Sequence, residues 1–154
     1  MTAVLVIGYG NTLRGDDGAG PKVAELVADT VLPEQATVLV RPQLLPELAA
    51  DLVDRSVVVF VDAAATPTPG SIAIRRIEAA AADASDGSGL THHVSPQALL
   101  LLAERLFGAR PNAFLVTLGA ASFDLGEELS PPVTAALPEA AAAVRRLIDE
   151  ACAG

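Results

Sequence analysis

The chain has 154 residues, of which 51% are hydrophobic and 19% charged, so its length suits one globular domain and its composition excludes a disordered chain. Its net charge of −9, from 10 lysines and arginines against 19 acids, argues against nucleic-acid binding because an acidic chain repels phosphate. A single cysteine, Cys152, excludes an internal disulfide framework and fits a cytoplasmic protein, and no apolar run reaches the ~18 residues of a membrane span.

Five stretches predict β-strands. Four are continuous runs of β-branched, aliphatic or aromatic residues, which indicate strands covered on both faces, as in a parallel sheet flanked by helices. A fifth, Ser71 to Ile77, partly alternates and is expected at a sheet edge. The four buried strands are expected at Ala3 to Gly8, Ala36 to Val40, Ser56 to Asp62 and Ala113 to Leu118.

Helical patterns lie between these strands. One opens with Ser95 as N-cap and a proline at the first helical position, and it stops at Gly108. Another contains Pro138, which we expect to kink or split the helix. This alternation predicts a three-layer α/β/α sandwich with a mostly parallel, roughly five-stranded twisted sheet. The helices are expected at Gly18 to Leu32, Leu45 to Leu52, Ser95 to Phe107 and Ser130 to about Ala151.

A glycine-rich stretch, GYGNTLRGDDG, follows the first predicted strand. Gly8 and Gly10 fit a dinucleotide fingerprint, but its third glycine position holds Leu13. Asp16 and Asp17 then stand where a pyrophosphate needs backbone N–H groups and no negative charge. A nucleotide-binding regulatory domain is therefore a disfavoured hypothesis.

Potential metal ligands follow the strands at one predicted edge of the sheet. In open α/β sheets, ligands bind beyond the carboxyl ends of the strands. Asp17 follows the first strand, Asp62 ends the third, and the only histidines, His92 and His93, precede a helix. Two carboxylates and an imidazole suit a divalent ion such as nickel, zinc or iron, and three protein ligands leave coordination positions open.

Structural roles for the same residues stay open at this point. Asp17 would also stabilise a helix N-terminus, Asp62 would cap a turn, and the histidine pair would lie solvated in a loop. Asp16 is expected to be exposed or hydrogen-bonded to loop N–H groups rather than to act as a further ligand.

Three stretches, GYGNTLRGDDGAGPKVAE, VVVFVDA and THHVSPQALLLLA, resemble the nickel–iron hydrogenase maturation endopeptidase family. The opening pattern of that family, G-x-G-N-x-[LM]-x-x-D-[DE]-x-x-G, runs here from Gly8 to Gly20. The resemblance extends from Val4 to about Leu147 and implies one such domain over residues 1–154. The segment RPQLLPELAADL is similar to members that serve cytoplasmic bidirectional-type hydrogenases.

The resemblance implies an endopeptidase that removes a C-terminal extension from the nickel-loaded large-subunit precursor of a nickel–iron hydrogenase. It implies that Asp17, Asp62 and a histidine sense the nickel, which the substrate delivers, with another divalent metal as the alternative. Asp17 and Asp62 are also the expected catalytic residues, since a divalent ion, or a carboxylate beside it, activates water for peptide hydrolysis. The free protein is expected to be a monomer with no membrane or nucleic-acid partner.

The histidine ligand is expected to be His92, which keeps the family's spacing to the leucine-rich helix without a gap; His93 is the alternative. Asn11 and Arg14 are candidate contacts for the substrate. A competing hypothesis is a non-proteolytic metal-binding chaperone or sensor of the same fold.

Overall fold

A computed structural model describes residues 3–81 and 94–153. Its five strands form one sheet in the order β2-β1-β3-β5-β4. β2, β1, β3 and β5 run parallel. β4 lies at the edge, as its partly alternating sequence predicts, and pairs antiparallel with β5. The strands are β1 (Val4–Tyr9), β2 (Thr37–Arg41), β3 (Val57–Ala65), β4 (Ile72–Ile77) and β5 (Asn112–Ala120).

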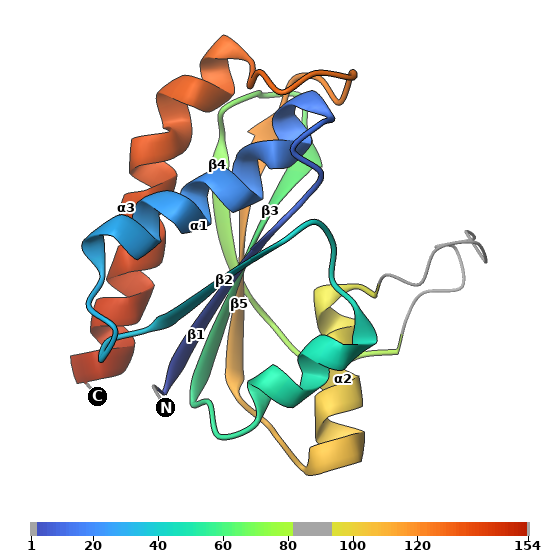
Figure 1. Cartoon of the computed structure of the whole chain (residues 1–154), viewed down its shortest axis with the longest axis vertical. Coiled ribbons are helices and arrows are strands. Elements are labelled where there is room, and N and C mark those ends of the chain that lie inside the picture. Colours follow the sequence, from blue (N-terminus) through green and yellow to red (C-terminus); the bar gives the residue numbers. More distant parts are fainter. Residues whose placement is uncertain (1–2, 82–93, 154) are drawn as a thin grey trace.

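Helices cover both faces of the sheet, so the expected α/β/α sandwich is confirmed. Figure 1 shows α1 and α3 on one face and α2 with the short 3₁₀ helix η2 on the other. No helix in the described ranges is long and apolar enough to cross a lipid bilayer. The helices are η1 (Gly15–Gly18), α1 (Ala19–Thr30), η2 (Pro46–Leu52), α2 (Pro96–Phe107) and α3 (Pro131–Ala153).

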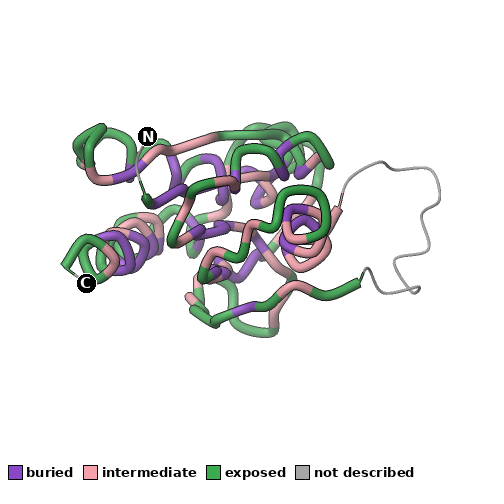
Figure 2. Tube along the Cα trace, turned by 90° about the horizontal axis from the view of Figure 1, so that it is seen from below, coloured by how far each residue is buried: buried purple, intermediate pink, exposed green. Residues whose placement is uncertain are grey.

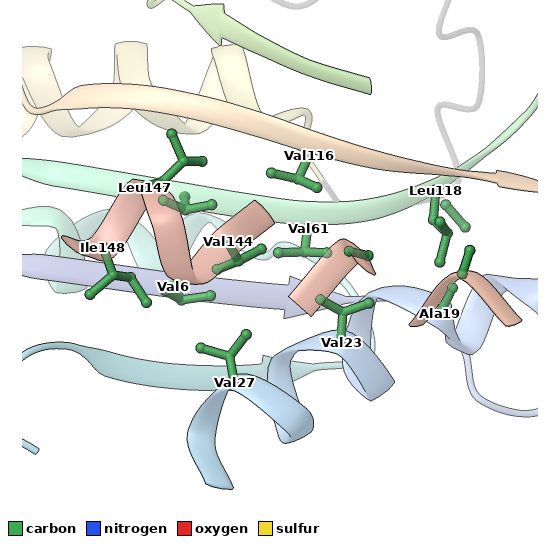
Figure 3. Packing of buried hydrophobic residues seen from close by; sticks show 14 of the residues in the cluster. Val6, Ala19, Val23, Val27, Val61, Val116, Leu118, Val144, Leu147 and Ile148 are labelled. Carbon is green, nitrogen blue, oxygen red and sulfur yellow. The ribbon is translucent and has the colours of Figure 1, made fainter. Parts of the chain in front are cut away.

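Successive strand residues feed two separate cores. In β1, Val4 and Val6 pack toward α1 and α3, whereas Leu5 and Ile7 pack toward α2 and η2. Because both faces are covered, the central strands β1, β3 and β5 are mostly apolar along their length. The buried residues gather between the sheet and the helices on either side (Figure 2). Each fully buried aliphatic side chain contributes about 1.5–3 kcal/mol. Figure 3 shows the first core, with Val6, Val61 and Val116 of the sheet facing Val23, Val27, Val144 and Ile148.

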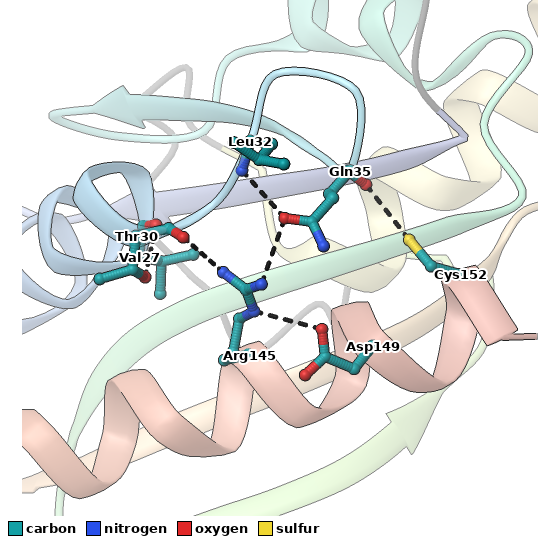
Figure 4. A network of polar contacts seen from close by, with 7 residues as sticks. All are labelled: Val27, Thr30, Leu32, Gln35, Arg145, Asp149 and Cys152. Atoms are coloured by element: carbon teal, nitrogen blue, oxygen red, sulfur yellow. Dashed lines mark hydrogen bonds and ion pairs between the residues drawn. The ribbon is translucent and has the colours of Figure 1, made fainter.

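One arginine joins α3 to the end of α1 (Figure 4). The Arg145 guanidinium donates to the Thr30 carbonyl oxygen at 2.6 Å and to the Gln35 side chain at 3.2 Å. It also pairs with Asp149 one turn along α3, at 3.2 Å. The thiol of Cys152 is free and exposed, and it donates to the Gln35 carbonyl oxygen at 3.6 Å. These contacts fix the two helices on one face relative to each other.

Two sequence expectations need correction. The third strand does not end at Asp62; it continues through Ala65 because Asp62 to Ala65 pair with β5 as far as Ala120. Pro138 was expected to kink or split the last helix; the split is wrong, since the helix is continuous over 131–153. The lost hydrogen bond is offset because buried residues on both sides of the proline pack into the same core, Val133 before it and Val144 after it.

Two glycines let α1 start directly above the sheet. A Cβ on Gly20 would stand 2.5 Å from the carbonyl oxygens of both Tyr9 and Val61, and one on Gly8 would stand 2.4 Å from the Gly20 oxygen. Only glycine permits this approach. The start of α1 and the preceding η1 are thereby held over the carboxyl ends of β1 and β3.

Candidate active site

A cavity of about 870 Å³ opens at the carboxyl ends of β1 and β3. All four expected site residues of the described chain line it: Asn11, Arg14, Asp17 and Asp62. Its apolar walls come from Tyr9, Leu44, Val94 and Phe123. We call this cavity the cleft. Both histidine candidates, His92 and His93, lie outside the described residues.

Asp62 lies partly buried in the floor of the cleft, near the end of β3. The Tyr9 hydroxyl donates to its Oδ2 at 3.0 Å, and the Ala63 N–H donates to its Oδ1 at 2.7 Å. Burial raises the pKa of Asp62 to about 6; the hydrogen bonds from Tyr9 and Ala63 oppose this shift, and the charge of Asp17 adds to it. The carboxylate is therefore held in place but incompletely stabilised as an anion.

Asp17 reaches the cleft from η1. Its Oδ2 accepts the Asn11 N–H at 2.6 Å, and the Asn11 side-chain oxygen accepts the Leu13 N–H at 2.9 Å. The loop folds back so tightly that a Cβ on Gly10, whose φ is +152°, would come within 1.9 Å of the Asp17 carbonyl oxygen. The glycine is required for this turn, and the turn sets the position of the carboxylate.

Several N–H groups of the loop after β1 already donate to acceptors within the protein. The Asn11 N–H bonds to Asp17, and the Gly10 N–H donates to the Arg41 carbonyl oxygen at 3.1 Å. Further along, the Gly15 N–H donates to the Gly126 oxygen at 2.8 Å. A phosphate at this loop would have to displace these bonds, which agrees with the disfavoured nucleotide hypothesis.

Asp16 is buried and bonded to a distant loop, although it is the neighbour of Asp17. It is 1% exposed, so the expectation that it is exposed is wrong, while the alternative of hydrogen bonding to loop N–H groups is confirmed. Its carboxylate accepts four hydrogen bonds: from the Ala121 and Ser122 N–H groups at 2.7 and 3.1 Å, and from the Ser130 N–H and hydroxyl at 2.7 and 2.8 Å. Burial alone raises the pKa of Asp16, but these donors, Ser130 foremost, outweigh it and lower the pKa.

The segment 121–130, which we call the latch loop, connects β5 to α3. Backbone bonds reinforce the Asp16 contact: the Gly126 N–H donates to the Leu13 oxygen at 2.8 Å, and the Asp16 N–H donates to the Ser122 oxygen at 2.9 Å. Phe123 of the latch loop lines the cleft. The latch loop therefore both anchors the loop that carries Asp17 and supplies one wall.

Comparison with known proteins places this arrangement in context. No protein-family model and no curated protein matches the chain. Solved structures do. The hydrogenase maturating endopeptidase HybD from E. coli is 26% identical, with a TM-score of 0.73 over 96% of this chain and 93% of that one. The fold is that of hydrogenase maturation endopeptidases.

Two further solved structures agree over nearly the full length. A hydrogenase 2 maturation peptidase from a Thaumarchaeota archaeon is 28% identical, with a TM-score of 0.67 over 94% of this chain and 97% of that one. An endopeptidase from Escherichia coli is 25% identical, with a TM-score of 0.75 over 96% and 93%. The similarity thus covers the cleft as well as the sheet.

The cleft of this endopeptidase fold offers oxygen ligands to a cation. Asp17 and Asp62 both line it, and the ion pairs Lys22–Glu25, Arg110–Glu104 and Arg145–Asp149 involve no residue that lines it. Within residues 3–81 and 94–153, no group of three His, Cys, Asp or Glu side chains could hold a metal. The described residues therefore supply two carboxylates of the expected ligand set.

Tyr9, whose hydroxyl donates to Asp62, was not among the expected site residues. The first strand was expected to end at Gly8, which placed Tyr9 in a loop, whereas β1 includes it. The period-2 pattern of strands carries the missing signal: Tyr9 continues the face of Ile7, and Asp62 continues the face of Phe60 on the neighbouring strand.

Proposed function

We propose that this chain is a hydrogenase maturation endopeptidase that removes a C-terminal extension from the large-subunit precursor of a nickel–iron hydrogenase. One observation carries the proposal: Asp17 and Asp62, which belong to separate stretches of the sequence, line one cleft in a fold shared with these endopeptidases. The segment from Arg41 to Leu52 supports a precursor of the cytoplasmic bidirectional type.

The precursor brings its nickel into the cleft as part of the substrate. Asp17, Asp62 and His92 contact it, with His93 as the alternative histidine. The two carboxylates support this role because no described ion pair involves them. Val94 supports the histidine because it lines the cleft, its N–H donates to the Leu44 oxygen at 3.0 Å, and one residue separates it from His92. Oxygen and imidazole ligands suit nickel or another divalent ion.

Hydrolysis needs a polarised carbonyl and an activated water, and the nickel of the precursor can supply both. In the alternative, nickel only positions the peptide, and Asp17 or Asp62 accepts the proton of the attacking water. Asn11 and Arg14 line the same cleft and contact the extension that is removed. The free protein acts as a cytoplasmic monomer that docks on the precursor transiently.

The test is a processing assay. Purified precursor, with and without nickel, is mixed with the protein, and the precursor's mass is followed. We expect loss of a C-terminal peptide from the nickel-loaded form alone, and loss of this cleavage in Asp17→Asn and Asp62→Asn.

Matched variants sharpen the assay. His92→Gln and His93→Gln identify the histidine, since only the substitution of the histidine that contacts nickel should abolish cleavage. Ser56→Ala is the control: it removes a hydroxyl bond to the Ala3 oxygen at the other end of β3 from Asp62. Nickel-dependent binding of the precursor without cleavage would instead favour the chaperone or sensor hypothesis, and cleavage by every variant would reject this site.

A further inference from the structure

We infer that Tyr9 is a positioning residue that fixes the Asp62 carboxylate for the nickel-loaded substrate. The inference rests on the proposed function and adds a residue to it. Tyr9 and Asp62 both line the cleft, and the Tyr9 hydroxyl donates to Asp62 Oδ2 at 3.0 Å. The two residues lie on neighbouring parallel strands, where the pair before them, Gly8 and Val61, is in register.

Tyr9 orients Asp62 without using up its capacity to bind. The Tyr9 hydroxyl holds Oδ2 and the Ala63 N–H holds Oδ1, so both oxygens are tied to the protein and the carboxylate cannot turn freely. Each carboxylate oxygen has two lone pairs, and these bonds use one on each. One lone pair on each oxygen is left for a cation or a water. Bonds of this kind to a metal-binding carboxylate set its orientation and its affinity.

The fold fixes Tyr9 at its other end. Its ring packs against the core formed by β1, β3, η2 and α2, on the same strand face as Leu5 and Ile7. A packed aromatic ring on a strand is a rigid support, since it has only two rotatable side-chain bonds. The packing of the ring and the pairing of β1 with β3 therefore direct the hydroxyl toward Asp62.

Packing alone does not account for the hydroxyl. A phenylalanine would fill the same space without burying a polar group, and burying an oxygen is favourable only when it is bonded. In the described part of the chain, that bond goes to Asp62.

The test compares Tyr9→Phe with the wild type and with Ser56→Ala, which also removes one side-chain hydroxyl bond but lies at the opposite end of β3. In the processing assay, we expect kcat of Tyr9→Phe to fall about 10- to 100-fold. KM for the precursor should stay within about twofold because the docking surfaces are intact. Ser56→Ala should leave both constants unchanged. A purely structural role predicts an unchanged kcat with a lower Tm, and that result would overturn the inference.

Crystal structures give a readout that does not depend on cleavage. We expect the Asp62 carboxylate to hold one orientation in the wild type and to rotate, or to occupy several orientations, in Tyr9→Phe. An identical single orientation in both proteins would overturn the inference. If the wild type does not cleave nickel-loaded precursor, the proposed function fails, and these two structures still decide whether Tyr9 orients Asp62.

Discussion

Two carboxylates in this protein differ sharply in how completely they are satisfied. Asp16, which bonds to the latch loop, is 1% exposed and accepts four hydrogen bonds, which lower its pKa. Asp62 in the cleft accepts one bond on each oxygen, and burial raises its pKa to about 6. A carboxylate whose oxygens are fully hydrogen-bonded stabilises the fold. A carboxylate that keeps free lone pairs, and whose negative charge is disfavoured by burial, is suited to bind a ligand. The contrast marks Asp16 as an acid that stabilises the fold and agrees with the role proposed for Asp62.

The largest effect should come from neutralising the cleft acid. In Asp62→Asn, we expect kcat for precursor processing to fall about 1,000-fold, because the carboxylate no longer binds a cation or accepts a proton. Thermal unfolding should shift by only a few degrees, since the side-chain volume is kept. Kinetics and a melting curve on one preparation test both statements, and normal kcat would remove Asp62 from the site.

The next largest effect should come from removing the hydrogen bonds between Asp16 and the latch loop. In Asp16→Ala, three backbone N–H groups and the Ser130 hydroxyl lose a charged acceptor, so we expect the free energy of unfolding to fall by about 3 kcal/mol. For a chain of this size, that lowers Tm by about 6–12 °C. Ser130→Ala removes one donor and should cost about 1.5 kcal/mol. Equal losses in the two variants would contradict the argument.

The pH dependence of stability should have opposite signs for the two acids. The lowered pKa of Asp16 contributes stability that is present above pH 3.8 and is lost as pH falls through its folded-state pKa. The raised pKa of Asp62 contributes stability below pH 3.8 that is lost as pH rises toward about 6. Urea unfolding from pH 3 to 7, with Asp16→Asn and Asp62→Asn each compared with wild type, should show the two trends; parallel curves would refute them.

The smallest effect is expected at Arg14, which stands between the two regions. Its backbone bridges to Gly126 of the latch loop, while its exposed side chain lines the cleft. Arg14→Gln should raise KM for the precursor about threefold, the size of an exposed charge contact, and should leave Tm unchanged. A lower Tm with unchanged KM would instead mean that the Arg14 side chain stabilises the contact with the latch loop.

Most of the fold was predictable because both sheet faces are covered. Continuous apolar runs located the strands, and capping at Ser95, whose Oγ accepts the Ala98 N–H at 3.1 Å, located the start of α2. The end of β3 was not predictable, because Ala63 to Ala65 have weak strand propensity and are held by pairing with β5. The segment expected as a helix at 45–52 is a 3₁₀ helix over Pro46–Leu52.

The site was predictable only in part. Asp17 and Asp62 could be chosen because parallel strands bring their carboxyl ends to one edge. The partner of Asp16 could not be predicted, since Ser130 lies 114 residues away. Tyr9 was missed because the first strand was expected to end at Gly8, one residue too early. That His92, or His93 as the alternative, contacts nickel stays a prediction, because both lie outside the described residues.

The bonds between Asp16 and the latch loop also have a consequence for biosynthesis. Translation proceeds from the amino terminus, so the loop that carries Asp17 leaves the ribosome long before Ser130, its anchor 114 residues downstream of Asp16. Contacts of such high sequence separation carry a large loop-closure cost, which slows folding. The nascent chain can therefore pair β1 with β2 and β3 early, but it acquires a fixed cleft only once the last third has emerged. An incomplete chain that lacks Ser130 also lacks the contact that anchors the loop carrying Asp17.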